Sequence, residues 1–148
     1  RKPLHDELQD VVWTLSVSQT KDFLGQLPLF PGMRVMVLEN VVFSVGIVNG
    51  AEGVVRDVKY NVDRRGRRVA SVVFVHIPGC GIRVDGLDDD VVPLFPQSMR
   101  IECKVHGADG KMSIQAFTRN QIPIIPAYSY TDFKSQGRTL DYVIVDLA

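Results

Sequence analysis

A polar segment near the carboxyl end of the sequence combines residue types suited to binding phosphate. The pattern predicts a short helix over Tyr128–Ser135, a Lys134-Ser135-Gln136-Gly137 turn and a buried strand over Leu140–Leu147. Such a junction places backbone N–H groups and a lysine at one edge of a sheet, where they suit contacts with phosphate or a nucleic-acid backbone. The alternative is a helix that ends at a capping glycine, with Lys134 in solvent.

Four arginines gather around Gly66 between two valine-rich stretches. This arrangement predicts a β-hairpin with a basic tip, formed by Arg64, Arg65, Arg67 and Arg68. Such a cluster of arginines is suited to binding a phosphate backbone. A solvated turn without a ligand is the alternative interpretation.

Two further groups of side chains have the residue types of metal ligands. His76-x3-Cys80 and Cys103-x2-His106 have the pair spacings of a Cys2His2 zinc site, but the two pairs fall on different expected strands. The acidic run Asp88–Asp90 has the ligands of a divalent cation. We favour ordinary histidines beside buried thiols for the first group and a solvated loop for the second, so no metal site is predicted.

Sequence motifs for nucleotide hydrolysis and for covalent catalysis are absent. No GxxxxGK[ST] occurs, and the glycine-rich stretch Gly46–Gly53 lacks the Lys-Ser/Thr pair. The apolar run Val143–Asp146 ends in a single aspartate and lacks the Asp-Glu pair that nucleotide hydrolysis requires at such a position. No serine or histidine lies in a nucleophile–base motif. We therefore expect no catalytic residue, no resident cofactor and no ATP hydrolysis by this chain alone.

The composition is that of an ordinary globular domain. The chain has 148 residues, 45% of them hydrophobic and 23% charged. Its 17 basic and 17 acidic residues balance, which gives no support for a large nucleic-acid surface but leaves room for a local one. No apolar run is long enough to cross a membrane, no signal peptide is visible, and two cysteines favour a reducing compartment.

The elements that must position these side chains change in character along the chain. Residues 3–25 carry apolar residues at helical spacing, with a possible second helix at Lys21–Leu24, and residues 78–99 have the glycines, prolines and aspartates of a loop. Short strands are expected at Met33–Glu39, Gly53–Tyr60, Val69–Ile77, Arg100–Val105 and Lys111–Phe117. The expected fold is mixed α/β: a small antiparallel barrel inserted into part of an α/β layer.

Three blocks of sequence resemble the Pif1-like helicases, the superfamily 1 group that includes RecD and the enzymes of Helitron transposons. Thr131, Lys134–Gly137, Thr139 and Leu140 match motif V of that family in register. Leu29–Asn40 with Gly46–Val55 resembles the start of its SH3-like 2B insert, and Arg119–Ile124 resembles the strand before motif V. Together the blocks cover Leu27–Ala148.

The resemblance implies a division of the chain and a set of contacts. Residues 1–28 would be a helical connection, residues 29–117 the SH3-like barrel, and residues 118–148 the return into a RecA-like domain. Thr131, Lys134 and Ser135 would contact single-stranded DNA, and Gln136 and Gly137 would lie nearer the nucleotide. Phe133 replaces the histidine of the family motif, so it cannot donate a hydrogen bond to phosphate but is able to stack on a base.

The implied parent is a nuclear, ATP- and Mg²⁺-dependent DNA helicase of repair or recombination that moves 5′ to 3′. This chain would be its carboxyl-terminal fragment, which stops before the motif that supplies the arginine finger. Its partners would be single-stranded DNA and the rest of the helicase chain, with self-association possible through an exposed sheet edge. The rival interpretation is a free-standing SH3-like module that binds a protein or a nucleic acid.

Overall fold

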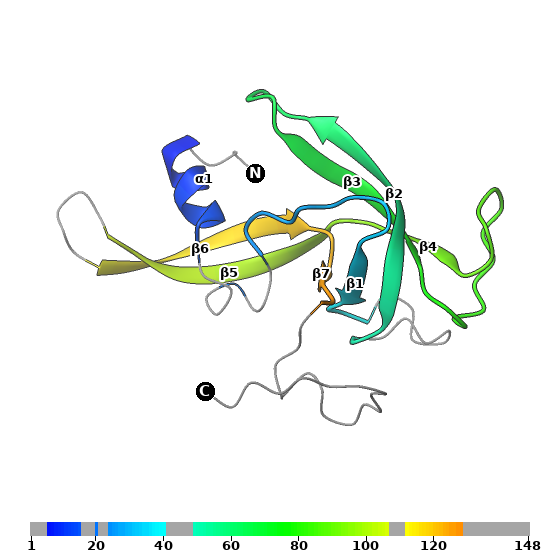
Figure 1. The fold of residues 1–148 in the computed structure, drawn as a ribbon. Coiled ribbons are helices and arrows are strands. Elements are labelled where there is room, and N and C mark those ends of the chain that lie inside the picture. The colour runs from blue at the N-terminus through cyan, green and yellow to red at the C-terminus, as the bar shows by residue number, and fades with distance from the viewer. Residues whose placement is uncertain (1–5, 16–19, 21–23, 41–48, 107–111, 129–148) are drawn as a thin grey trace.

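The computed structural model describes residues 6–15, 20, 24–40, 49–106 and 112–128. Over these ranges the chain is almost entirely antiparallel β-structure with one short helix (Figure 1). The elements are α1 (Asp6–Trp13), β1 (Arg34–Val37), β2 (Glu52–Val62), β3 (Arg68–His76), β4 (Val91–Leu94), β5 (Gln97–His106), β6 (Met112–Gln121) and β7 (Ile124–Pro126). No helix in the described part is long and apolar enough to cross a membrane.

Five of the strands form one sheet in the order β4-β3-β2-β1-β7, and every neighbouring pair is antiparallel. Alternate residues of these strands point into a core that also takes side chains from the segment before β1. Valine dominates this core because a β-branched side chain packs well on a pleated surface. The buried members include Val35, Val37, Val55, Val73, Val75, Leu94 and Ile124.

Gly53 allows β2 and β3 to approach each other closely inside this core. A Cβ atom at Gly53 would lie 2.6 Å from the carbonyl oxygen of His76 and 2.6 Å from a methyl carbon of Val75. A glycine at this position is therefore required by packing against the neighbouring strand rather than by a turn.

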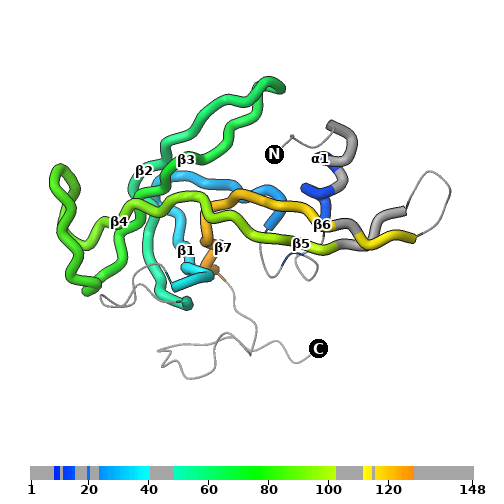
Figure 2. The backbone as a smooth tube through the Cα atoms, turned by 180° about the vertical axis from the view of Figure 1, so that it is seen from behind, coloured from blue at the N-terminus to red at the C-terminus, as the bar shows by residue number. Residues whose placement is uncertain are grey.

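The remaining two strands, β5 and β6, form a separate two-stranded ribbon. Their register runs from the Gln97–Gln121 pair to the His106–Met112 pair. In both views the ribbon extends away from the larger sheet, and α1 lies over it (Figures 1 and 2). Val12 of α1 packs on Phe117 of β6, with Leu15 against both, so the helix and the ribbon share a small apolar cluster.

The expected strands at Met33–Glu39, Gly53–Tyr60, Val69–Ile77, Arg100–Val105 and Lys111–Phe117 all have counterparts in the structure. The expectation of a loop over residues 78–99 is wrong at its end, where β4 and the start of β5 lie. Pro93 suggested a loop, yet β4 is an edge strand, where a missing N–H need not cost a ladder hydrogen bond.

The expected helix over residues 3–25 is also too long. Within the described residues α1 ends at Trp13, and Leu24 and Gly25 are not helical. The expected antiparallel fold is confirmed, whereas the α/β layer rests on residues 129–148, which lie outside the described ranges. The division at residues 117 and 118 falls within β6, and β7 beyond it pairs with β1; that division stays a prediction.

Candidate nucleic-acid interface

The basic tip predicted from the sequence is a real turn between β2 and β3, and Asp63 organises it. One carboxylate oxygen of Asp63 accepts hydrogen bonds from the backbone N–H groups of Arg65 (2.8 Å) and Arg67 (3.0 Å). The turn closes through Gly66, which has a φ of 74°. These bonds, above all the one from the Arg67 backbone, hold the pKa of Asp63 below its ordinary value.

Two of the four tip arginines are paired with acidic side chains. Arg65 makes a two-pronged contact with Asp10 of α1, at 2.9 and 3.1 Å. Arg67 donates from Nε to Asp63 at 2.6 Å and lies 3.7 Å from Asp10. The tip is therefore tied to α1, and part of its positive charge is already neutralised.

Arg67 also stacks on the ring of Trp13, with its guanidinium carbon 4.0 Å from the ring centroid. A second contact to the helix runs from Arg67 Nη2 to the side-chain oxygen of Gln9, at 3.2 Å. Trp13 is the aromatic partner in this stack. It is half-buried and stacks with a guanidinium, which leaves less of its face open to a nucleic-acid base.

The other two tip arginines are more available. Arg68 lies over Tyr60 at 4.9 Å from the ring centroid, and both side chains are exposed. Arg64 is exposed and has no ion pair within the part of the chain that the structure describes. These two side chains are the ones best placed to meet a phosphate without first releasing an acidic partner.

Arg119 of β6 reaches the carboxyl end of α1. Its Nη2 donates to the carbonyl oxygen of Val12 at 2.6 Å, and 9% of the residue is exposed. Val12 is in the last turn of the helix, where carbonyls lack helical partners and the dipole favours a cation. Burial lowers the pKa of Arg119 below its ordinary value.

The residues predicted from motif V lie outside the described ranges. These are Thr131, Lys134 and Ser135 for DNA contacts and Gln136 and Gly137 near the nucleotide. The same holds for Phe133. Their assignments stay predictions.

The histidines and cysteines that have the spacing of a zinc site lie in two different parts of the structure. His76 ends β3 and Cys80 follows it, whereas Cys103 and His106 are on β5 of the ribbon, where only the backbone is described. Cys80 lies beside Asp90, with its sulfur 3.6 Å from a carboxylate oxygen. Among the described residues no group of three potential ligands gathers.

One member of the acidic run, Asp90, has a structural role. Its two carboxylate oxygens accept hydrogen bonds from the backbone N–H groups of Gly79 (2.9 Å) and Gly81 (2.7 Å), which lower its pKa. Its own φ is 62°, a conformation that aspartate tolerates better than most residues. The neighbouring Asp89 pairs with exposed Arg83 at 3.2 Å.

Sequence reasoning found the tip but missed the residues that hold it. Asp63 carried a local signal, because an aspartate three positions before a glycine is typical of a type I turn. Asp10, Gln9 and Trp13 carried none, since they reach the tip only through the docking of α1. The sequence shows Arg119 as part of a family pattern, and no local signal marks it as a buried cation.

No protein-family model matches the sequence. Two curated proteins do, the "ATP-dependent DNA helicase PIF1" of Rattus norvegicus and that of Mus musculus. Each is 32% identical over 121 residues, which are 82% of this chain and 15% of the relative. The chain is a Pif1-like helicase segment.

Solved structures of Pif1 helicases also match the Pif1-like chain. One is the Pif1 helicase from Bacteroides in complex with ADP-AlF3 and single-stranded DNA, with 25% identity and a TM-score of 0.48. Another is unliganded Pif1 from Bacteroides, with 25% identity and a TM-score of 0.46. Each match covers 78% of this chain and 22% of the solved one. The Pif1-like chain thus spans about 15% of the length of the curated relatives.

Proposed function

We propose that this chain is the part of an ATP-driven DNA helicase that holds single-stranded DNA. In the intact parent it would be an SH3-like 2B barrel inserted into a RecA-like domain that moves 5′ to 3′ and unwinds duplex DNA. The observation that supports this proposal most is the 32% identity to the PIF1 helicases over 121 residues. The antiparallel β-structure of the described residues is consistent with an SH3-like domain.

The chain's own residues suit binding rather than hydrolysis. The sequence has no Walker-type phosphate loop, so ATP and Mg²⁺ would be held by other parts of the parent. Gln136 and Gly137 would approach the nucleotide from this side. We expect the isolated chain to show no ATPase activity, and we expect the parent to act in the nucleus.

Charge at the tip supports a contact with the DNA backbone. Arg64 and Arg68 are exposed, and they extend the basic surface beyond Arg65 and Arg67. A phosphate that approaches Arg65 competes with Asp10 for the same guanidinium. The affinity of the tip for the DNA backbone is therefore lower than four arginines without acidic partners would give. This affinity depends on whether α1 is docked.

Fluorescence anisotropy of labelled oligo-dT tests this proposal. Binding should weaken as salt rises from about 50 to about 200 mM, because bound cations release counterions from the strand. We expect Lys134→Ala and a variant with neutral residues at Arg64, Arg65, Arg67 and Arg68 each to weaken binding. Arg56→Met, at an exposed arginine of β2 outside the tip, is the matched control.

The outcomes separate the helicase interpretation from its rival. Salt-sensitive binding that falls in either variant and not in the control supports a DNA-holding segment. No binding at concentrations on the order of tens of micromolar would contradict it for this chain. That result would favour an SH3-like module that binds a protein partner or the rest of the parent chain.

A further inference from the structure

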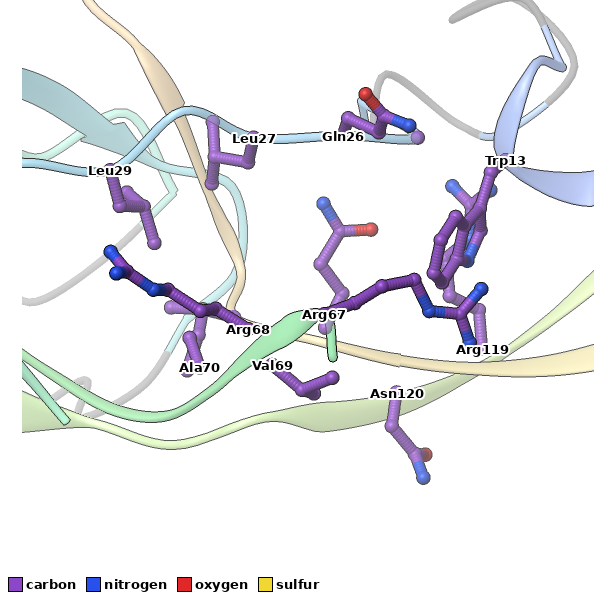
Figure 3. Close-up of a pocket in the computed structure, with 13 residues that line it drawn as sticks. Trp13, Gln26, Leu27, Leu29, Arg67, Arg68, Val69, Ala70, Arg119 and Asn120 are labelled. Carbon is purple, nitrogen blue, oxygen red and sulfur yellow. The ribbon is translucent and has the colours of Figure 1, made fainter. Parts of the chain in front are cut away.

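A cavity of about 340 Å³ lies between the end of α1, the tip and β6. Figure 3 shows Arg67 reaching toward Trp13 at the end of the cavity where Arg119 lies. Arg68 is also among its lining residues, and no carboxylate of the described chain lines it. The wall of the cavity therefore carries three arginines and no acidic side chain, although Asp63 pairs with Arg67 from outside the cavity.

Two of the lining guanidinium groups have buried nitrogen atoms that lack hydrogen-bond acceptors. Nη1 of Arg119 has no partner, although Nη2 of the same group is bound to Val12. Nη1 of Arg67 likewise makes no hydrogen bond and lies 3.7 Å from a carboxylate oxygen of Asp10, while Nε and Nη2 of the same group are paired with Asp63. The guanidinium of Arg119 has no acidic partner in the described chain, so an acceptor that enters the cavity beside its Nη1 is favoured.

The opposite end of the cavity is lined by apolar side chains and by Arg68, whose side chain extends toward Leu29. Leu27 and Leu29, from the segment before β1, face Val69 and Ala70 of β3 (Figure 3). The size falls at the lower end of the range for small-molecule sites, which combine apolar walls with a few placed polar groups. A ligand with an anionic group at one end and a flat or apolar body at the other matches this division.

We propose that this cavity binds the phosphate group of a nucleotide. Arg67 and Arg119 donate to the phosphate oxygens, because planar guanidinium groups match them geometrically. The sugar or base lies against Leu27 and Leu29. The phosphate belongs either to a free nucleotide or to one unit of a DNA strand. The inference does not depend on the proposed helicase role.

Trp13 provides a direct readout of this cavity. It is the one tryptophan of the sequence, it lines the cavity and it stacks on Arg67. Intrinsic fluorescence of the full chain is followed during titration with thymidine 5′-monophosphate, with thymidine and with inorganic phosphate. We expect a saturable change with the monophosphate, with a dissociation constant on the order of 1 mM or below, and none with thymidine. Inorganic phosphate should bind more weakly, because it lacks the apolar contacts.

Two exposed valines of the same hairpin give a matched pair of variants. Val69 is 47% exposed and lines the cavity, whereas Val62 is 62% exposed and does not line it. Val69→Glu places a carboxylate beside the arginines and should weaken nucleotide binding about tenfold or more. Val62→Glu should weaken it less, because its carboxylate lies opposite Arg68 in the strand pair but outside the cavity. Because both sites are exposed, both variants should fold, and Arg119→Met adds a test at the buried donor.

Several results would overturn the proposal. An equal response to thymidine and to its monophosphate would show that the phosphate group does not contribute to binding. Equal affinity in Val69→Glu and Val62→Glu would place the binding site elsewhere. The same pair of variants, tested with oligo-dT, identifies the source of the phosphate.

The oligo-dT arm also separates this inference from the proposed function. A selective loss of oligo-dT binding in Val69→Glu would assign the site to a DNA strand. Monophosphate binding without oligo-dT binding would support the cavity for a free nucleotide and contradict the proposed function. If Val69→Glu binds oligo-dT with unchanged affinity and the monophosphate gives no response, the proposed function stands and the proposal of a phosphate site in the cavity is contradicted.

Discussion

The contact between Asp10 and the tip gives the sharpest test of how α1 is held. Asp10→Asn removes the negative charge that Arg65 meets at 2.9 and 3.1 Å and Arg67 at 3.7 Å. The side chains of Asp10 and Arg65 are 52% and 39% exposed, so the pairs are screened by water. Exposed ion pairs contribute about 0.2–1 kcal/mol each, and a two-pronged arginine contact lies in the upper half of that range.

We therefore expect Asp10→Asn to lower the free energy of unfolding by about 0.5–1.5 kcal/mol. Urea unfolding of Asp10→Asn, Arg65→Met and the double variant isolates the pairwise part, which should be about 0.5–1 kcal/mol. The coupling should shrink at about 1 M salt, where the Debye length is only about 3 Å. Asp85→Asn, at an exposed aspartate without a side-chain ion pair in the described structure, is the control.

The same substitution should have the opposite effect on DNA. With Asp10 neutral, its carboxylate no longer competes with a phosphate for Arg65, so binding of oligo-dT should tighten. One additional phosphate contact on a single strand steepens the plot of log affinity against log salt by about 0.7. A coupling energy of zero, with unchanged stability and an unchanged salt slope, would refute the reasoning that ion pairs to Asp10 hold the tip against α1.

Other predictions follow from the core and from the loop carboxylates. Gly53→Ala should lower the free energy of unfolding by about 1–3 kcal/mol in urea titrations, because the added Cβ would overlap the His76 carbonyl. A fully stable Gly53→Ala variant would contradict the close approach of β2 and β3. The pKa of Asp63 and that of Asp90 lie below the ordinary value of 3.8 in the folded chain. Their stabilising contribution should be complete above that value and be lost as the pH falls through it toward the folded pKa. Thermal unfolding between about pH 3 and pH 6 measures this dependence, and Asp90→Asn should flatten it; a melting curve insensitive to pH in both proteins would exclude the effect.

Much of the β-structure was predictable because it is encoded locally. Alternation of valine with polar residues gives β2 and β3, and the glycine among arginines gives the turn between them. β4 was missed because Pro93 and Pro96 suggested a loop, although a proline is tolerated in an edge strand. Nothing local marks a strand as an edge, since that property depends on the order of strands in the sheet.

The site was only half predictable for a similar reason. The arginines of the tip are visible as a cluster, but the partner of Arg65 lies 55 residues away in the sequence. Arg119 contacts Val12 over a separation of 107 residues. Contacts of this kind arise from the packing of α1 on the ribbon, which the helical pattern of residues 3–25 does not specify. The sequence therefore shows the four arginines of the tip but not the acidic side chains that neutralise part of their charge.

Amide chemical-shift mapping of the full chain with oligo-dT tests the central claim most directly. If this Pif1-like segment holds single-stranded DNA, the largest shifts should fall on residues 64–68 of the tip and on residues 131–135 of the motif-V block. They should diminish together as the salt concentration rises from about 50 to about 200 mM. Shifts confined to the face of β3 and β4, or none under saturating DNA, would contradict the claim.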